Sequence, residues 1–422
     1  MEILKEYLHN SLKLSKKNID LVFACEEEVS EEFARYTEIA AINQIKVLNA
    51  FKKNEISTRH FSPSTGYGYG DSGREKLCSL YADIFHTEDA LVSPLLMSGT
   101  HAIVTALFGL LRPGEKMLSV TGKPYDTLQN TLTGGTGSLG EYKIGYLNLP
   151  LKRDNTIDME NAIRILKIDS GIKLAYIQRS TGYDIRRALT VGEMEQAIRA
   201  IKNECKDVLV FVDNCYGEFV EALEPSEIGA DIVVGSLIKN AGGGIAPTGG
   251  YIAGTTELIE KISYRFTAPG IGMEIGSYAY GYREFFQGVF MAPHTVSQAL
   301  MGVTLAAKVF EKLGYQTTPA ADAPRGDITQ MIVFHDKDML TAFVRGVQRA
   351  SAVDGHVVPY AWDMPGYENQ VIMAAGTFVD GASLELTADG PMREPYAAYL
   401  QGGLTYAHAR TGILYALDEM GI

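Results

Sequence analysis

Residues 231–244, with the sequence DIVVGSLIKNAGGG, decide the interpretation of this chain. The apolar run Asp231–Val234 indicates a buried strand, and Lys239 follows it with three glycines, Gly242 to Gly244, close behind. A lysine just past a strand is usually solvated, and glycines alone mark a loop. The combination is rarer, and glycine lets the backbone pass close to a ligand. The segment therefore predicts a ligand site at the end of this strand.

Six further short apolar runs alternate with amphipathic helices from about residue 85 to residue 295. Continuous apolar runs joined by helices indicate a mostly parallel sheet that is covered on both faces. Together with Asp231–Val234 they make a sheet of seven candidate strands. The other six are Leu91–Ser93, Lys116–Val120, Tyr142–Leu147, Lys173–Gln178, Val208–Val212 and Gly249–Ala253.

The chain divides into three expected parts. It has 43 glycines in 422 residues, yet the first is Gly66 and the first proline is Pro63. Residues 1–60 are therefore expected to be a helical N-terminal arm, with Ser30 as a helix N-cap, whose apolar stripe packs on its own body or on a second subunit. Residues 61–295 are expected to form a large α/β domain, and residues 296–422 a smaller C-terminal α+β domain.

The composition excludes several classes of protein. With 38 Lys and Arg against 51 Asp and Glu, the net charge of −13 argues against a nucleic-acid partner. Four scattered cysteines fit a reducing cytosol rather than a disulfide scaffold, and the eight histidines lack the spacing of a metal site. No apolar run approaches the roughly 18 residues of a membrane span, and the start lacks the pattern of a signal peptide. We expect a cytoplasmic protein with no membrane partner.

Polar residues follow two other strands of the expected sheet. Asp213 follows Val208–Val212, and Ser98-Gly99-Thr100 opens a helix after Leu91–Ser93. Each has an ordinary alternative, because aspartate often forms turns and Ser98 caps a helix well. Ligands of open α/β sheets bind outside the carboxyl ends of the strands, however. We therefore expect these residues to converge with Lys239 at one edge of the sheet.

Pyridoxal phosphate is the cofactor that uses such a set. Its aldehyde forms a Schiff base with a lysine amine, which Lys239 supplies. Its pyridine nitrogen needs a carboxylate to stay protonated, which Asp213 supplies. Its phosphate fits a helix N-terminus. Tyr125, in the loop after Lys116–Val120, is a candidate to stack on the ring, although a surface turn is an equal alternative.

Five segments together resemble the methionine gamma-lyase and aluminium-resistance family of fold-type-I pyridoxal phosphate enzymes, which is similar in fold to cystathionine beta-lyase. They are residues 97–102 (MSGTHA), 122–127 (GKPYDT), 235–244 (GSLIKNAGGG), 357–367 (VVPYAWDMPGY) and 385–396 (ELTADGPMREPY).

The resemblance implies a role for each matching residue. Lys239 would bind the cofactor and act as general base, Asp213 would pair with the ring nitrogen, and Tyr125 would stack on the ring. Arg393, beside the turn-rich Asp389-Gly390-Pro391, would bind the substrate carboxylate. The phosphate would be held by Ser98, Gly99, Thr100 and Ser236.

Residues 68–73, GYGDSG, match the GxGxxG pattern of dinucleotide-binding proteins. No strand precedes them, so the pattern does not predict dinucleotide binding. In related lyases such a segment completes the phosphate site of the neighbouring subunit. The resemblance therefore implies this role for Tyr67, Tyr69 and Arg74, and with it a homodimer or homotetramer with shared active sites.

The expected function is that of a carbon–sulfur lyase. Such an enzyme acts on an amino acid of the cystathionine, cysteine or methionine type and releases a keto acid, ammonia and a thiol by α,β- or α,γ-elimination. Ile238 departs from related lyases, which have threonine before the lysine. An aminotransferase, a racemase, a decarboxylase or a low-turnover cofactor-binding protein therefore remains open as an alternative.

Overall fold

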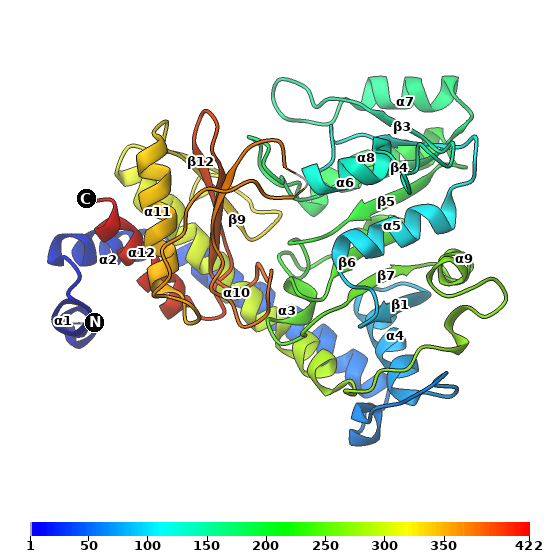
Figure 1. Cartoon of the computed structure of the whole chain (residues 1–422), viewed down its shortest axis with the longest axis horizontal. Helices are drawn as coiled ribbons and strands as arrows, with labels where there is room; N and C mark the ends of the chain where they lie inside the picture. Colours follow the sequence, from blue (N-terminus) through cyan, green and yellow to red (C-terminus); the bar gives the residue numbers. More distant parts are fainter. Residues whose placement is uncertain (1, 366) are drawn as a thin grey trace.

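Seven strands form the larger of two sheets in this computed structural model, which describes residues 2–365 and 367–422 (Figure 1). Met1 of the expected arm and Gly366 of the segment 357–367 lie outside the described residues. The strand order is β1-β7-β6-β5-β4-β2-β3. Strand β7 runs antiparallel to β1 and β6, and all other neighbouring strands are parallel. The expected seven-stranded, mostly parallel sheet is confirmed. Its strands are β1 (Asp89–Ser93), β2 (Lys116–Ser119), β3 (Gly145–Asn148), β4 (Ile172–Gln178), β5 (Leu209–Asp213), β6 (Ile232–Ser236) and β7 (Gly250–Gly254).

Helices cover both faces of this sheet, because its strands carry apolar side chains on either side. One face packs against α5 (Gly99–Leu110), α6 (Asp126–Thr133) and α9 (Thr256–Phe266). The other packs against α4 (Ser72–Ile84), α7 (Met159–Ile168), α8 (Val191–Glu204) and α10 (Arg283–Lys312). The carboxyl ends of the parallel strands stay free of these layers.

A second, wholly antiparallel sheet has the strand order β10-β11-β12-β9-β8. Helices α11 and α12 pack on one face of this sheet, through residues such as Ile332, Ala388 and Leu400. Alternate residues of the same strands face the opposite way. The elements are β8 (Gln316–Thr318), β9 (Thr329–Val333), α11 (Lys337–Ala350), β10 (Val371–Ala374), β11 (Thr387–Pro391), β12 (Ala397–Gln401) and α12 (Tyr406–Glu419).

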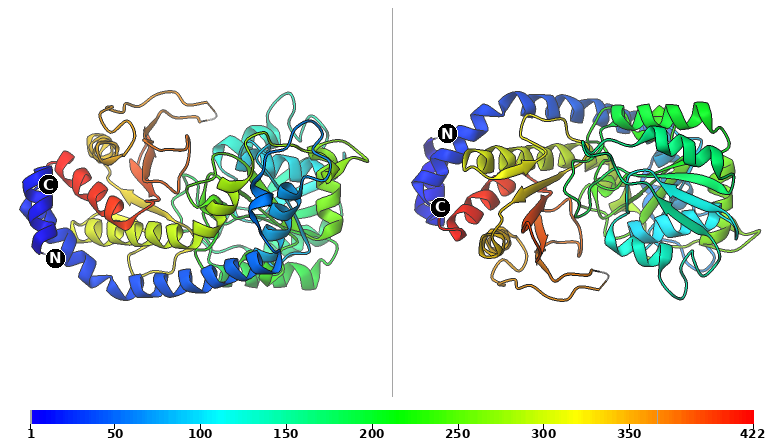
Figure 2. Two further views of the ribbon diagram at one scale, coloured as in Figure 1. Left: turned by 90° about the horizontal axis from the view of Figure 1, so that it is seen from below. Right: turned by 90° about the horizontal axis from the view of Figure 1, so that it is seen from above.

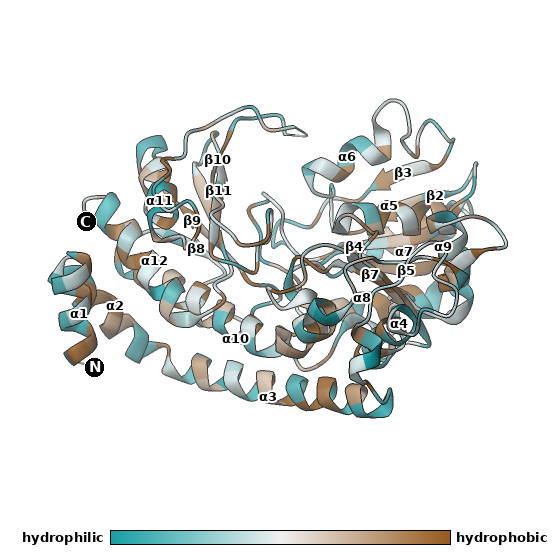
Figure 3. Ribbon diagram, turned by 60° about the horizontal axis from the view of Figure 1, so that its bottom comes forward, coloured by the Kyte–Doolittle hydropathy of each residue, from teal (hydrophilic) through white to brown (hydrophobic). Residues whose placement is uncertain are grey.

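The N-terminal segment is helical, with α1 (Glu2–Leu12), α2 (Lys16–Glu28) and α3 (Ser30–Lys53). Hydrophobic and hydrophilic residues alternate along α3 (Figure 3). Its apolar stripe packs on α10 of the same chain, where the Tyr36 hydroxyl and Thr304 Oγ1 share a hydrogen bond of 3.0 Å (Figure 2). Ser30 is not an N-cap but the first residue of α3, since Val29 occupies the cap position.

Helix α10 crosses the expected domain boundary at residue 295 without a break and runs from the larger sheet to the second sheet (Figure 1). The division into three domains stays a prediction. Among the described residues, no helix is both long and apolar enough to cross a membrane.

Candidate active site

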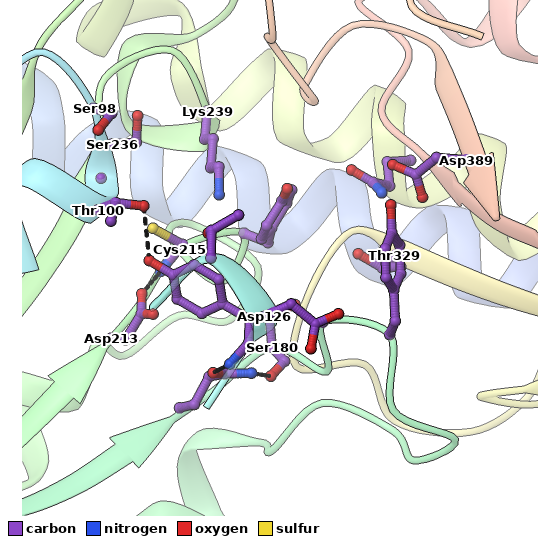
Figure 4. A pocket seen from close by; sticks show the side chains of 18 of the residues that line it. Ser98, Thr100, Asp126, Ser180, Asp213, Cys215, Ser236, Lys239, Thr329 and Asp389 are labelled. Carbon is purple, nitrogen blue, oxygen red and sulfur yellow. Dashed lines mark hydrogen bonds between the residues drawn. The ribbon is translucent and has the colours of Figure 1, made fainter. Parts of the chain in front are cut away.

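A cavity of about 230 Å³ lies at the carboxyl ends of β4, β5 and β6 (Figure 4). The larger sheet and its loops supply most of the walls, and the second sheet supplies Thr329, Asp389 and Gln401. The sequence-predicted residues Lys239, Asp213, Tyr125 and Ser236 all line it, as do Ser98, Gly99 and Thr100. The convergence expected from the strand ends is therefore present in the structure.

Lys239 lies three residues beyond the end of β6, and its side chain points into the cavity (Figure 4). Its Nζ atom lies 3.9 Å from the centre of the Tyr216 ring, a cation–π distance. Burial lowers the pKa of the Lys239 ammonium, while Cys215, Tyr216 and Asp213 raise it, and the net shift is upward. The amine is thus held among groups that complement a positive charge.

Asp213 is the last residue of β5, is buried, and lines the same cavity. Its carboxylate accepts hydrogen bonds from the Tyr176 hydroxyl at 3.1 Å and from the backbone N–H of Cys215 at 3.2 Å. Burial raises the pKa of Asp213, and the charge of Lys239 opposes that shift. A buried carboxylate of this kind is stabilised by a cationic partner, such as a protonated ring nitrogen.

The N-terminus of α5 faces the end of β6. Ser98 caps this helix by accepting a hydrogen bond from the N–H of His101 at 3.1 Å, which leaves the N–H groups of Gly99 and Thr100 available. A Cβ at Gly99 would lie 3.1 Å from Cys215 Sγ and 3.2 Å from Ser236 Cβ. The absence of a side chain therefore keeps the helix end close to Ser236, an arrangement that could hold an anion.

Tyr125 immediately precedes α6 and is held at both its backbone and its side chain. Its hydroxyl shares a 2.9 Å hydrogen bond with Thr100 Oγ1, and its N–H donates to Gln178 Oε1 at 2.9 Å. Burial raises the pKa of Tyr125, so its hydroxyl keeps its proton. Arg179, the residue directly after β4, does not line the cavity and pairs with Glu221 at 2.7 Å.

Four sequence-predicted residues do not line the cavity of this chain. Tyr67 and Tyr69 are exposed, and Arg393 is exposed beyond β11. Arg74 is buried and donates hydrogen bonds to the carbonyls of Gly68 and Gly276, at 2.9 and 3.0 Å. Their roles toward the cofactor, the substrate or a neighbouring subunit stay predictions.

The three glycines after Lys239 do not approach the cavity, although the sequence pattern predicts that they make room for a ligand. A Cβ at Gly243 would lie 2.1 Å from the Gly288 carbonyl in α10, and Gly243 has a φ of +62°. Gly243 therefore allows the lysine loop to pack against α10. A Cβ at Gly242 would instead meet the Leu237 carbonyl of the same loop, and one at Gly244 would meet the Leu404 side chain.

The cavity residues that sequence reasoning did not single out include Tyr183, Tyr216, Tyr367 and Asp389. Tyr216 comes three residues after a strand-end aspartate, which is a usable signal. It has a φ of +71°, and its hydroxyl accepts a hydrogen bond from Ser383 at 3.0 Å. Asp389 lies within strand β11, where its neighbours Gly390 and Pro391 had indicated a turn.

The residues of the cavity fit pyridoxal phosphate. They provide an amine, a buried carboxylate, an aromatic ring and an anion cradle, and Gly99 keeps that cradle free of a Cβ. Among the described residues, no cluster of His, Cys, Asp or Glu has the arrangement of a metal site. The fold and the site together define a fold-type-I protein that depends on pyridoxal phosphate. The chain belongs to the methionine gamma-lyase family, whose sequence model matches residues 18–421.

Known proteins agree with this assignment. The chain is 48% identical to a carbon–sulfur lyase involved in aluminum resistance from Clostridium novyi NT, with a TM-score of 0.95 over 99% of both chains. It is 49% identical over 94% of both chains to the uncharacterized protein YnbB of Bacillus subtilis. Cystathionine gamma synthase from Xanthomonas oryzae is 14% identical, with a TM-score of 0.58 over 86% of this chain and 92% of that one, and shares the fold.

Proposed function

We propose that the protein is a carbon–sulfur lyase that acts on a sulfur-containing amino acid by α,β- or α,γ-elimination. The observation that carries this proposal is the convergence of Lys239, Asp213 and Tyr125 on one cavity. The similarity to the Clostridium novyi lyase supports sulfur as the leaving atom. The products would be a keto acid, ammonia and a thiol.

Three groups of this chain would handle protons and charge. Bound pyridoxal phosphate supplies an electron sink for carbanion chemistry. Lys239 would bind it covalently and, once displaced by the substrate amine, would accept the α-proton at Nζ. Asp213 would hold a negative charge against the ring nitrogen. Ser98, Gly99, Thr100 and Ser236 would hold the phosphate.

The departing thiolate needs a proton, and Tyr125 is suited to supply it. Its hydroxyl is protonated because burial raises its pKa, and Thr100 fixes its position through the 2.9 Å hydrogen bond. Lys239, which has just taken the α-proton, is the alternative donor. A Tyr125→Phe variant separates the two, because it retains the ring and removes only the hydroxyl.

The test of the proposal is a panel of cystathionine, cysteine, methionine and homocysteine with keto-acid detection. Pyruvate would indicate β-elimination and 2-oxobutyrate γ-elimination. Lys239→Ala should lose both the keto acid and the visible absorbance of the bound cofactor, while the exposed Lys123→Ala should keep both. A coloured wild-type protein that yields no keto acid from any of the four would reject the lyase and favour another amino-acid reaction or cofactor binding alone.

A further inference from the structure

The second sheet turns one face toward the cavity, and Asp389 lies on that face. In β11, Ala388 packs with the helices α11 and α12, so its neighbour Asp389 faces the other way. Asp389 pairs in register with Tyr399 of β12, whose hydroxyl donates to the Tyr183 carbonyl at 2.8 Å. The pairing of β11 with β12 and the hydrogen bond from Tyr399 to the loop that contains Tyr183 therefore fix the direction in which the Asp389 carboxyl group points.

No salt bridge among the described residues involves the carboxyl group of Asp389, which lines the cavity. Its Oδ1 atom is buried and has no hydrogen-bond partner in the described part of the chain. Burial raises the pKa of Asp389 to about 7, and hydrogen bonding from the Tyr183 side chain to the carboxyl group partly opposes this shift. Lys239 is the one basic side chain among the described residues that line the cavity, and it stands across the cavity from Asp389 (Figure 4). Native proteins rarely leave a buried carboxyl oxygen without a partner.

The surroundings of Asp389 favour a positively charged partner. Asp126, at the start of α6, is a second carboxylate of the cavity. Burial raises the pKa of Tyr367 to about 12, and the charges of Asp389 and Asp126 add to that shift. The rings of Tyr183 and Tyr367, 5.5 Å apart, lie in the same wall. Carboxylates and the faces of aromatic rings attract an ammonium group.

We propose that Asp389 determines specificity by binding an ammonium group carried on the sulfur side of the substrate. This inference rests on the proposed lyase function. The α-amine of the substrate must reach the position of Lys239, so the ammonium group at Asp389 is a second one. A substrate with a neutral side chain leaves the carboxyl oxygen without a partner, and this costs binding energy. The structure thus assigns the cavity to sulfur amino acids with a distal cation.

Two substrates of nearly equal size test the inference: S-(2-aminoethyl)cysteine carries a terminal ammonium where S-propylcysteine carries a methyl group. In each, elimination breaks the Cβ–S bond, the thiol leaves with a proton, and water releases pyruvate and ammonia. Wild type should prefer the ammonium compound by about 10- to 100-fold in kcat/KM, the worth of one hydrogen bond to a charged group. Asp389→Asn should abolish most of that preference, chiefly by lowering kcat/KM for the ammonium compound.

Asp380→Asn is the matched control, because Asp380 is exposed in the segment before β11 and the charge change is the same. If Asp389→Asn lowered kcat/KM equally for both substrates, Asp389 would have a positioning role and the inference would be overturned. Calorimetric titration of the holoenzyme with both compounds gives a second readout that needs no turnover. If neither compound yields pyruvate but wild type still binds the ammonium compound more tightly, β-elimination is rejected while the role of Asp389 stands; the four-substrate panel then decides whether the lyase function fails as a whole. Equal dissociation constants would overturn that role.

Discussion

The hydrogen bond between Tyr176 and Asp213 gives a prediction whose magnitude can be worked out from the structure. The Tyr176 hydroxyl donates to the buried carboxylate at 3.1 Å, and its ring stacks on Phe211 with centroids 5.6 Å apart. Tyr176→Phe keeps the ring and removes the donor. A hydrogen bond to a charged group contributes about 1.5–3 kcal/mol, and one pKa unit corresponds to about 1.4 kcal/mol. The substitution should therefore raise the pKa of Asp213 by roughly 1–2 units above its already raised value.

The sign of the effect depends on the charge that Asp213 must carry. Its carboxylate form is the one that pairs with a cationic ring, and this form is lost as the pH falls through its pKa. A higher pKa therefore moves the acid limb of kcat/KM to higher pH, by about 1–2 pH units. Activity above the limb should change little. The measurement is the pH profile of keto-acid formation by both proteins.

Two further variants serve as controls for this experiment. Tyr36→Phe removes a buried tyrosine hydroxyl of the α3–α10 contact, away from the cavity, and should leave the limb in place. Asp213→Asn cannot carry the charge at any pH and should lose most activity throughout. An acid limb that stays fixed in Tyr176→Phe would refute the claim that this hydrogen bond controls the ionisation of Asp213.

Three other substitutions test the packing of the protein, one at the cavity and two elsewhere. Gly99→Ala places a Cβ 3.1 Å from Cys215 Sγ and 3.2 Å from Ser236 Cβ, and should weaken cofactor affinity about tenfold, read by equilibrium dialysis. Asn43→Ala removes the side chain that donates to two backbone carbonyls at 3.2 and 3.0 Å, and should lower the free energy of unfolding by about 2–4 kcal/mol in urea titrations. Gly243→Ala meets a carbonyl of α10 at 2.1 Å and should abolish soluble expression. Normal affinity, stability or yield, respectively, would contradict these expectations.

The sequence was sufficient to predict the residues that converge on the cofactor side of the cavity. All seven strands of the larger sheet are short apolar runs, and parallel strands end at one edge. The positions of Lys239, Asp213 and Ser98 could therefore be inferred from their places just beyond the ends of these runs. The resemblance to a known family then added the role of Ser236, which lies at the end of β6 beside Gly99.

The second sheet could not be placed in the same way. Its strands are short, and β11 contains a Gly-Pro pair that is typical of a turn, so Asp389 carried no local signal of facing a cavity. Its contact with the site depends on where α10 holds this sheet, and that placement is set by packing between distant segments. Tyr216 likewise lies beside Lys239 because its backbone adopts a φ of +71°, a conformation that the local sequence does not predict.

The two sheets contribute different walls of the cavity, and this division indicates how the fold separates cofactor binding from substrate choice. Lys239, Asp213 and the cradle at α5 all belong to the larger sheet, whereas Asp389 and Gln401 come from the second sheet. Helix α10 joins the two sheets as one continuous element, and α3 packs along it. Because none of the residues predicted to bind the cofactor lies in β11 or β12, substitutions in those strands could change the substrate that the cavity accepts and leave the cofactor groups in place. Substrate choice within the family should therefore be sought in the second sheet, and cofactor chemistry in the first.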